Sequence, residues 1–473
     1  MATILGANTL SDDYQVANSV RFNPGDSAYM HKTPTAGNRR TATFSCWIKR
    51  SLISSAQTVF WAGSDNSNYQ AVVRLLANDK IVVAEINGGS TTWEIITDRI
   101  LVDAAAWYHI VVAMDTTQGT AANRVKIYVN GVQETSFGAA NYPNEDATDK
   151  INSAIRHDIS GRNHASTSDL YLNAYLAEVV FIDGQQLAPT SFGEFDSDSG
   201  IWVPIEVSDL TFGNNGFYLD FEASGNLGND ANGGTDLTEV NLAATDQSTD
   251  TCTNNFCTLN PLDPTADITL SEGNLKAVYG TSGTRDVQVS TFGVSSGKWY
   301  WEIKVGGAES PNNATLGITQ NSSDNAVVLG GNTNNSWEYR GYDGKVYHNA
   351  GDEGGSLDTF TENDIIGVAI NLDTLQSGLH KLYFSKNGTF QNGADPEDFT
   401  STTGVYGIDD NVDYFPAISD AGSSATPSFE MNFGSPSHSV SSGNADANGH
   451  GNFEYAPPAG FFALCTKNLA EFG

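Results

Sequence analysis

The ten residues from Ser296 to Val305, SGKWYWEIKV, restrict the local fold because their side chains alternate in character. Successive side chains of a β-strand point to opposite faces of its sheet. One face receives Trp299, Trp301, Ile303 and Val305. The other face receives Tyr300, Glu302 and Lys304. The pattern predicts a half-buried antiparallel strand with its tryptophans in the core and a polar outer face, and favours this over an aromatic platform that itself grips a ligand.

Short apolar runs of this kind recur along the chain and are separated by turn residues. WYHIVVAMD has the nearly continuous apolar middle of a strand that is covered on both faces. RVKIYVNGVQE and HKLYFSKNGTF each contain Asn-Gly, at 130–131 and 387–388, which is a strong signal for a β-hairpin because both residues accept a positive φ. With 47 glycines as further turn formers, the chain is predicted to be all-β.

These runs predict two antiparallel β-sandwiches, and the family resemblances given below imply the concanavalin A-like, jelly-roll type. We expect an N-terminal extension over 1–18, a first sandwich over 19–195 and a second sandwich over 268–434. Residues 196–267 are rich in Asn, Asp, Thr and Gly, and we expect an extended connector there that packs on its neighbours. A tail over 435–473 contains the apolar run FFALC, which we expect to dock on the chain or on a neighbouring subunit.

The charge balance excludes several classes of partner. The 473 residues include 56 acidic and 23 basic side chains, a formal net charge of −33. Nucleic acids and anionic membranes both attract basic surfaces, so neither is an expected partner. No apolar run of about 18 residues predicts a transmembrane helix, and MATILGANTLSDDYQV lacks the basic and apolar segments of a secretory signal. Four cysteines are too few for a disulfide scaffold, so we expect free thiols made in a reducing cytoplasm, with a Cys252–Cys257 bridge as the alternative.

No motif for catalysis stands out, and we expect no enzyme activity. Glycan hydrolases need two carboxylates about 5–10 Å apart across a cleft, and the sequence has no Glu-x-Asp-x-Glu strand. Asp220 and Glu222 in YLDFE are the one such pair on a strand-like face, and we interpret them as solvated. The GxSxG match GVSSG, at 293–297, is no nucleophile elbow, because it leads into a strand and not into a helix. His109 lies in an apolar strand as a core residue. The remaining enzyme hypothesis is a polysaccharide depolymerase.

Carbohydrate binding needs exposed aromatic rings for stacking beside polar hydrogen-bonding groups. In the first sandwich the candidate loop residues are Trp61, Asp65, Asn66, Tyr69 and Trp93. In the second they are Asn335, Trp337, Tyr339, Arg340 and Tyr342. The alternative for each cluster is an aromatic ring packed on a neighbouring strand or loop.

Two family resemblances follow from the motifs. SGKWYWEIKV, LGITQ, DIIGVAINLD, LYFSKNGTF, YFPAIS and MNFG, in this order, resemble a SPRY domain, which implies a concanavalin-like sandwich that binds protein partners through its loops. FSCWIKR, WYHIVVAMDT, VKIYVNGVQ and LAEVVFIDGQQL resemble a laminin-G or pentraxin-like domain, which implies binding of glycans or proteins, in some members through calcium. Many laminin-G domains have an acidic calcium ligand where this chain has Asn68, and Asp65 is a nearby substitute. No cofactor is expected, with calcium as the one alternative.

The phrases GNRRTATFSCWIKRS, GFYLDFEASGNLGNDANG, TNNFCTLNPL and YAPPAGFFALCTKNL are similar to those of virion proteins of tailed, often marine, bacteriophages. This resemblance implies a virion surface protein that is made in the host cytoplasm and released by lysis. We expect a homotrimeric tail fibre or similar appendage that recognises a host-surface glycan or protein. The alternative is a capsid or tail decoration protein that binds other virion proteins.

Overall fold

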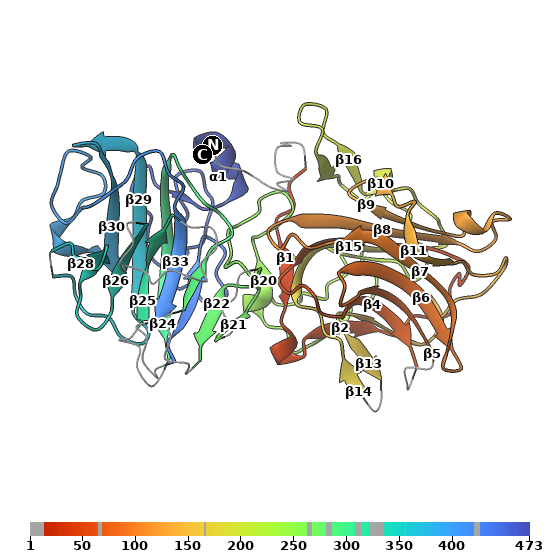
Figure 1. Ribbon diagram of the computed structural model, residues 1–473. Coiled ribbons are helices and arrows are strands. Elements are labelled where there is room, and N and C mark those ends of the chain that lie inside the picture. The colour runs from red at the N-terminus through yellow and green to blue at the C-terminus, as the bar shows by residue number, and fades with distance from the viewer. Residues whose placement is uncertain are drawn as a thin grey trace. The chain divides into compact units, whose positions relative to one another are not determined.

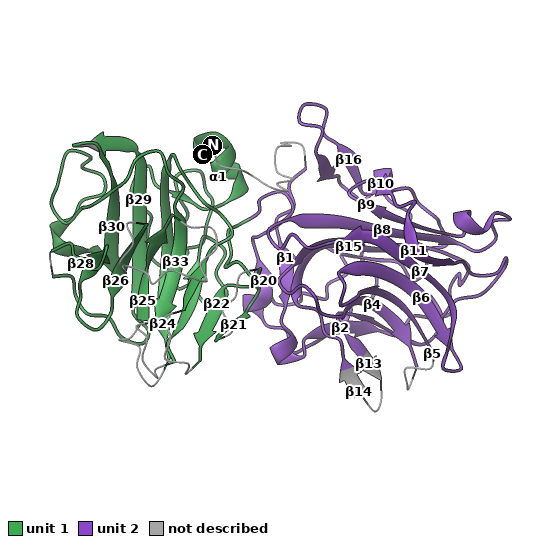
Figure 2. Cartoon of the chain, viewed as in Figure 1, with its two compact units in different colours: residues 1–5, 256–473 green, residues 6–255 purple. Residues whose placement is uncertain are grey.

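The computed structural model describes residues 14–64, 69–164, 167–262, 267–280, 286–307, 314–320, 335–354, 356–420 and 426–473 (Figure 1). The chain divides between Asn255 and Phe256 into two compact units (Figure 2). We call the purple unit, described from residue 14 to 255, the N-terminal unit, and the green unit, described from residue 256, the C-terminal unit. The stretch 196–267, which the sequence analysis treats as one connector, is thus divided between the units.

Two antiparallel sheets build the N-terminal unit. Sheet A contains, in spatial order, β10 (Val132–Gln133), β9 (Val125–Val129), β8 (Trp107–Asp115), β3 (Thr41–Arg50), β15 (Ala174–Asp183), β1 (Ser19–Phe22) and β20 (Gln247–Ser248), with β18 (Phe217–Leu219) paired to β15. Sheet B contains β11 (Phe137–Asn141), β7 (Ser90–Ile100), β6 (Lys80–Asn87), β5 (Tyr69–Leu75), β4 (Gln57–Gly63), β12 (Arg156–Ile159), β2 (Tyr29–Lys32) and β19 (Thr238–Val240).

The core of this unit lies between the two sheets. In β3, the alternating side chains of Phe44, Cys46 and Ile48 enter the core, where they join Phe60 of sheet B. The rings of Phe44 and Phe60 stack across the core with their centroids 4.9 Å apart. Burial of such apolar surface stabilises the sandwich by roughly 25 cal/mol per Å². The predicted all-β sandwich is confirmed for this unit.

Later chain segments cover the other face of sheet A. Residues of β3, β8 and β15 pack there against residues that precede β1 or follow β15, in two clusters. One cluster contains Val16, Trp47, Trp107, Tyr175, Ala177, Trp202 and Cys252. The other contains Val111, Val180, Ile182, Phe192, Val207, Phe212 and Tyr218. Residues up to 255 of the expected connector therefore form an outer layer of the first sandwich.

A buried ion pair attaches this outer layer to sheet A. The Nζ atom of Lys49 donates hydrogen bonds to Asp250 over 2.7 Å and to the side chain of Asn255 over 2.6 Å. The indole N–H of Trp107 donates to the second carboxylate oxygen of Asp250 over 3.1 Å. The side chains of Lys49 and Asp250 are 1% and 2% exposed, so the pair is held by direct contacts and not by water.

A β-bulge in β15 turns the side chain of Glu178 into a second polar cluster of the outer layer. The register between β15 and β3 shifts between Ala177 and Val180, and Glu178 has a φ of 50°. Its buried carboxylate accepts hydrogen bonds from the hydroxyl groups of Tyr14 (3.1 Å) and Tyr218 (2.8 Å). Burial is the main reason that the pKa of Glu178 rises from 4.5 to about 8.

We expect Glu178→Gln to flatten the pH dependence of stability. Because the folded pKa lies above the unfolded one, protonation of Glu178 stabilises the fold fully below pH 4.5, and this contribution is lost as the pH rises through about 8. The wild-type free energy of unfolding should therefore fall by up to about 1.4 kcal/mol per pH unit more steeply than that of the variant. Urea unfolding of both chains at pH 5, 6.5 and 8 measures the difference. If the free energy of unfolding depended on pH equally in both chains, the raised pKa of Glu178 would be contradicted.

The C-terminal unit is a second sandwich. Its larger sheet contains β21 (Ile268–Ser271), β22 (Lys276–Tyr279), β34 (Ser428–Asn432), β24 (Lys298–Gly306), β29 (Ile365–Gln376), β30 (Leu379–Lys386) and β31 (Thr389–Phe390), with β32 (Tyr406–Ile408) paired to β30 and β35 (Phe462–Ala463) to β24. The smaller sheet contains β23 (Val287–Val289), β33 (Phe415–Asp420), β25 (Ala314–Thr319), β26 (Ser336–Arg340), β27 (Val346–His348) and β28 (Gly351–Asp352).

The stretch SGKWYWEIKV forms the centre of the larger sheet as β24. Trp299, Trp301, Ile303 and Val305 are all buried in the core, as the alternation predicts. The expected polar outer face is wrong for Tyr300 and Glu302, which are each 1% exposed. Apolar residues from the tail cover this outer face, where they pack with residues of β24, β29 and β30. The cluster contains Phe256, Tyr300, Ala369, Tyr383, Phe453, Phe461, Ala463 and Cys465.

The carboxylate of Glu302 binds the tail directly. It accepts hydrogen bonds from the backbone N–H groups of Glu454 (2.9 Å) and Tyr455 (2.7 Å). It also accepts from the side-chain amide of Asn432 (3.2 Å) and the hydroxyl of Tyr300 (3.1 Å). The tail then adds β35, the one parallel neighbour of β24, and the short helix α1 (Thr466–Phe472). The expected docking of the apolar tail therefore takes place on its own unit.

The remaining elements are small. Two hairpins project from the N-terminal unit, namely β13 (Arg162–His164) with β14 (Thr167–Asp169), and β16 (Gly193–Phe195) with β17 (Trp202–Pro204). Short 3₁₀ helices are η1 (Pro24–Asp26), η2 (Ala121–Asn123), η3 (Pro189–Ser191), η4 (Ala244–Asp246) and η6 (Gln391–Gly393). All four cysteines are free and buried. In the part of the chain that the structure describes, no helix has the length and apolar character needed to cross a membrane.

Candidate functional site

The outward face of sheet B is the strongest candidate for a binding surface, and we call it the B face. Side chains directly opposite each other on paired strands share a face. Asp158 of β12 lies opposite His31 of β2 on one side and Trp61 of β4 on the other. The row continues through Val72 and Ala84 to Glu94. An apolar cluster on this face consists only of residues from β4 to β7 and Leu76, so no described segment adds an apolar layer to it.

Trp61 forms the floor of the B face. It lies in β4, is 1% exposed, and its indole N–H donates a hydrogen bond to the side-chain oxygen of Gln70 over 2.9 Å. Its ring lies against Gly63, where a Cβ atom would come within 2.1 Å of the indole. Trp61 therefore shapes the surface, whereas the sequence analysis expects it in an exposed loop.

Half-buried aromatic and charged side chains form one end of the B face. The rings of Tyr29 and Tyr171 are stacked with their centroids 6.3 Å apart, and the ring of His31 lies 5.9 Å from that of Tyr29. The guanidinium group of Arg156 lies 5.0 Å from the centre of the Tyr29 ring, and its Nε atom donates to Asp158 over 2.7 Å. This arrangement places ring faces beside fixed hydrogen-bond donors, as stacking on a sugar requires.

Burial and the charge of Arg156 both lower the pKa of His31. The imidazole is therefore neutral at pH 7 and can either donate or accept a hydrogen bond. Tyr29, His31, Arg156 and Tyr171 are not among the site residues predicted from the sequence. The alternation of Tyr29 with His31 and of Arg156 with Asp158 is the signal that could have indicated them.

The other candidates of the first sandwich are distributed differently. Asp65, Asn66 and Asn68 lie outside the described residues, and Tyr69 begins β5 next to them. Trp93 of β7 points into the core, where it is 3% exposed and donates its indole N–H to Asp149 over 3.2 Å. The expectation of an exposed ring is wrong for Trp93, because the inward register of β7 decides its direction.

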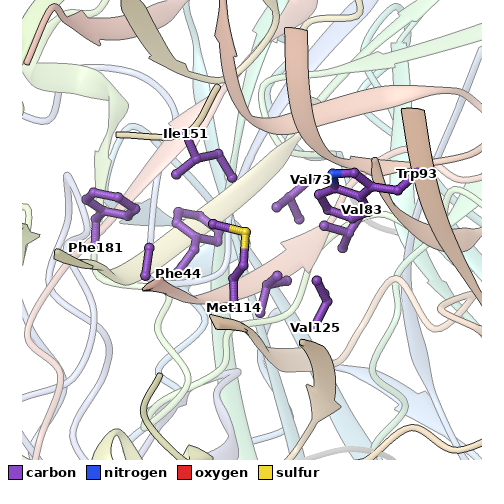
Figure 3. A pocket seen from close by; sticks show the side chains of 10 residues that line it. Phe44, Val73, Val83, Trp93, Met114, Val125, Ile151 and Phe181 are labelled. Carbon is purple, nitrogen blue, oxygen red and sulfur yellow. The ribbon is translucent and has the colours of Figure 1, made fainter. Parts of the chain in front are cut away.

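An internal cavity lies beside Trp93, between the sheets (Figure 3). Its walls are the apolar side chains Ala42, Phe44, Val73, Val83, Trp93, Val112, Met114, Val125, Ile151 and Phe181. About 10 Å³ is open to the centre of a water-sized sphere, which is too small for a sugar or another organic ligand. The cavity is a feature of core packing.

In the C-terminal unit, two of the candidate aromatic residues belong to the core. The ring of Trp337 is 2% exposed and stacks on His348 at 4.1 Å, and Tyr339 is fully buried and donates its hydroxyl to the backbone oxygen of Asp358. Asn335 precedes β26 and accepts a backbone hydrogen bond from Gln320 over 2.7 Å. The exposed-loop expectation is wrong for Trp337 and Tyr339.

Arg340 and Tyr342, by contrast, lie next to each other, with Arg340 9% exposed and Tyr342 at the surface. The guanidinium group of Arg340 lies 3.6 Å from the centre of the Tyr347 ring and forms an ion pair with Glu338. Tyr342 is 45% exposed, and its hydroxyl lies 3.5 Å from a guanidinium nitrogen of Arg340. The hydroxyl of Tyr347 donates to Asp343 over 2.9 Å. This small polar and aromatic cluster is a second candidate contact surface.

A serine–histidine pair exists but is not arranged for catalysis. The Nε2 atom of buried His109 lies 2.8 Å from the hydroxyl of Ser45, while the indole N–H of Trp202 donates to Nδ1 over 3.0 Å. Because Nδ1 accepts a hydrogen bond, the proton of the neutral ring is on Nε2, which donates to Ser45 and cannot activate it. Burial lowers the pKa of His109 to about 3, so it stays neutral. This matches the predicted core histidine.

The two carboxylates in the row across the B face, Asp158 and Glu94, are too far apart for glycan hydrolysis. Asp158 and Glu94 are separated by four strand spacings of about 4.8 Å, or about 19 Å, whereas hydrolases place the pair about 5–10 Å apart. Asp220 follows β18 and accepts the backbone N–H of exposed Glu222, as in a surface turn. Among the described residues, no group of three or more His, Cys, Asp or Glu side chains could hold a metal ion.

Two family models match the chain. Residues 23–187 match the laminin G model of the concanavalin A-like lectin/glucanases superfamily, and residues 298–430 match the SPRY domain. The chain carries a laminin-G-like domain and a SPRY domain. Both are binding-type folds, and the B face belongs to the laminin-G-like domain. The two predicted domain types are confirmed.

Several solved structures are similar to part of this chain. The SPRY domain of human HERC1 is 19% identical, covers 37% of this chain and 96% of its own, and has a TM-score of 0.29. A heptameric SAP-like pentraxin from Limulus polyphemus is 12% identical over 37% of this chain and 80% of its own, also with a TM-score of 0.29. A Bacteroides ovatus protein proposed to bind carbohydrate is 15% identical over 48% of this chain and 58% of its own, with a TM-score of 0.29. No curated protein matches the sequence.

Proposed function

We propose that the chain is a non-enzymatic binding protein of a tailed-bacteriophage virion, and that its laminin-G-like domain holds a host-surface glycan on the B face. The observation that carries this proposal is the difference between the two outer faces of the first sandwich. The outer face of sheet A is covered by later segments of the chain, whereas the B face presents half-buried rings and fixed donors. A glycan needs this combination.

The geometry suggests how a sugar is held. One face of a sugar ring stacks on Tyr29, which Tyr171 supports from the side. Arg156 donates hydrogen bonds to hydroxyl or carboxylate oxygens, since its position is fixed by the Tyr29 ring and by Asp158. Arg156 is 32% exposed, which leaves part of its guanidinium group accessible.

The virion setting rests on the similarity of phrases along nearly the whole chain to phage virion proteins. A homotrimeric tail fibre or similar appendage on the virion surface, made in the host cytoplasm and released by lysis, is the form that we propose. We include protein partners in the proposal as well, because SPRY domains bind proteins. Asp65 and Asn68 remain candidate calcium ligands within this proposal.

One observation favours decoration of other virion proteins as a second function. Val132 and Phe195 are 50% and 54% exposed. Gly131, next to Val132, lies against the ring of Trp202, and Phe195 packs edge-on against the same ring at 4.9 Å. An apolar patch of this kind on a domain surface suits contact with another protein.

We expect the purified chain to be retained by bacterial surface polysaccharides without releasing new reducing ends. Tyr29→Ala should weaken retention about tenfold, because a stacked ring contributes about 0.5–1.5 kcal/mol beyond its area. Tyr342→Ala, in the SPRY domain, is the matched control and should leave retention unchanged. Affinity chromatography with and without calcium measures retention, and sedimentation gives the number of subunits.

Other results of this experiment would support the alternative functions. New reducing ends would support the depolymerase hypothesis, and loss of retention in Tyr342→Ala alone would move the site to the SPRY domain. No retention on any glycan, together with cross-linking to other virion proteins, would favour decoration. Loss of retention after calcium is removed would support the metal site.

A further inference from the structure

Basic side chains are scarce in this chain, yet three arginines gather on or beside the B face. Arg74 lies in β5, Arg156 in β12 and Arg162 in β13, the strand that follows β12. Two carboxylates, Asp158 and Asp169, accompany them. The three guanidinium groups therefore share two carboxylate partners among the described residues, on a chain whose net charge is −33.

We infer that the ligand of the B face is an anionic glycan, whose carboxylate or sulfate groups are bound by the guanidinium groups of Arg74 and Arg162. This inference rests on the proposed glycan-binding function and adds the chemical class of the ligand. Arginine suits this task because its planar fork donates two parallel hydrogen bonds to a carboxylate or sulfate.

The guanidinium group of Arg74 has one donor that no described residue satisfies. Its Nε atom donates to the hydroxyl of Thr58 over 3.3 Å, whereas its buried Nη2 atom has no acceptor among the described residues. Burial is the main cause that lowers the pKa of Arg74 to about 10, and repulsion by Arg162 is the next. A desolvated guanidinium group with an unmet donor is costly, and an anion would remove that cost.

The contacts of Arg162 show that a carboxylate is a suitable partner for the guanidinium groups of this surface. Its Nε and Nη2 atoms donate to the two carboxylate oxygens of Asp169, over 2.8 and 2.5 Å. Its side chain is 18% exposed. The charge of Asp169 acts on Arg74 as well as on Arg162, so one carboxylate faces two neighbouring guanidinium groups, and an external anion would balance the second.

Arg156 extends the basic character toward the aromatic end of the B face. Its Nη2 atom is also buried without an acceptor in the described part of the chain, although Nε is bound to Asp158. The same surface thus offers rings for the sugar and guanidinium groups for its charges. A neutral glycan would leave these donors unsatisfied, which argues for an acidic one.

The test compares the full chain on polygalacturonate, dextran sulfate and neutral dextran in 0.15 M salt. We expect retention on at least one of the two anionic polymers and at least tenfold weaker binding to dextran. Arg74→Gln and Arg162→Gln should each weaken anionic binding about 10- to 100-fold, the range for a charge-assisted hydrogen bond. The two anionic polymers distinguish carboxylate from sulfate as the bound group.

Arg40→Gln is the matched control, because Arg40 is 47% exposed and belongs to a surface ion pair with Asp146. It should bind like the wild type. Circular dichroism checks that each variant folds, and Arg74→Lys, which keeps the charge but loses the fork, should bind more weakly than wild type. The net charge of −33 repels polyanions, so nonspecific retention is not expected.

The outcomes separate this inference from the proposed function. Equal binding to dextran and to the anionic polymers, or unchanged anionic binding in both glutamine variants, would overturn the anionic ligand and leave glycan binding intact. No binding to any of a wide panel of glycans would overturn both.

Discussion

Replacing Glu302 by alanine is expected to lower the free energy of unfolding of the C-terminal unit, which contains the SPRY domain, by about 3–5 kcal/mol. The carboxylate is 1% exposed and accepts four hydrogen bonds, two of them from the backbone of the tail at Glu454 and Tyr455. Each buried donor left without a partner costs about 1–3 kcal/mol, and partial rearrangement reduces the sum. Guanidinium chloride unfolding of the full chain measures the loss.

A second effect of Glu302→Ala should be local. The tail loses its attachment to β24, so limited proteolysis is expected to cut within 441–460 faster than in the wild type. Lys304→Ala is the matched control on the same strand, because Lys304 is 31% exposed and its contact with Glu430, at 3.9 Å, is a surface ion pair worth at most about 1 kcal/mol. Equal stability of the two variants would show that Glu302 does not hold the tail.

Asp250→Ala is expected to destabilise the N-terminal unit by about 3–5 kcal/mol. The substitution leaves the charge of Lys49 buried without the carboxylate of Asp250 that pairs with it. It also removes the acceptor of the Trp107 indole N–H. The double variant Lys49→Met/Asp250→Leu should recover much of the loss, since apolar side chains of similar size can replace a buried ion pair. Thermal unfolding of the single and double variants measures both effects.

Arg40→Ala serves as the control for this pair. Arg40 and Asp146 are 47% and 62% exposed and 3.4 Å apart, so their loss should change stability by less than about 1 kcal/mol. If Asp250→Ala were as mild as Arg40→Ala, the attachment of the outer layer to sheet A would depend on its apolar contacts alone.

The strands were predictable because alternation reports directly on which side chains face a core. In β24 the four core residues are the predicted ones. The outer face of the same strand was not predictable, because Tyr300 and Glu302 are covered by residues more than a hundred positions later. A local pattern assigns side chains to faces but does not say what covers each face.

The same limit explains why the residues of the candidate site could not be predicted correctly from the sequence. Trp61, Trp93, Trp337 and Tyr339 are next to turn residues in the sequence, and this made them resemble loop residues. In the structure they lie within strands, whose register buries them. Tyr29 and Arg156 meet only because β2 pairs with β12, which follows it by more than a hundred residues. No local signal reports such a pairing, although the acidic composition made any cluster of arginines conspicuous.

The attachment of the tail to β24 has a consequence for biosynthesis. A ribosome delivers β24 long before residues 454–463, so the sheet of the SPRY unit waits with the outer surface of Tyr300, Ala369 and Tyr383 bare. A chain interrupted between these two points would expose that apolar surface to aggregation or to proteases. Folding of this domain can therefore be completed only after translation has passed residues 454–463.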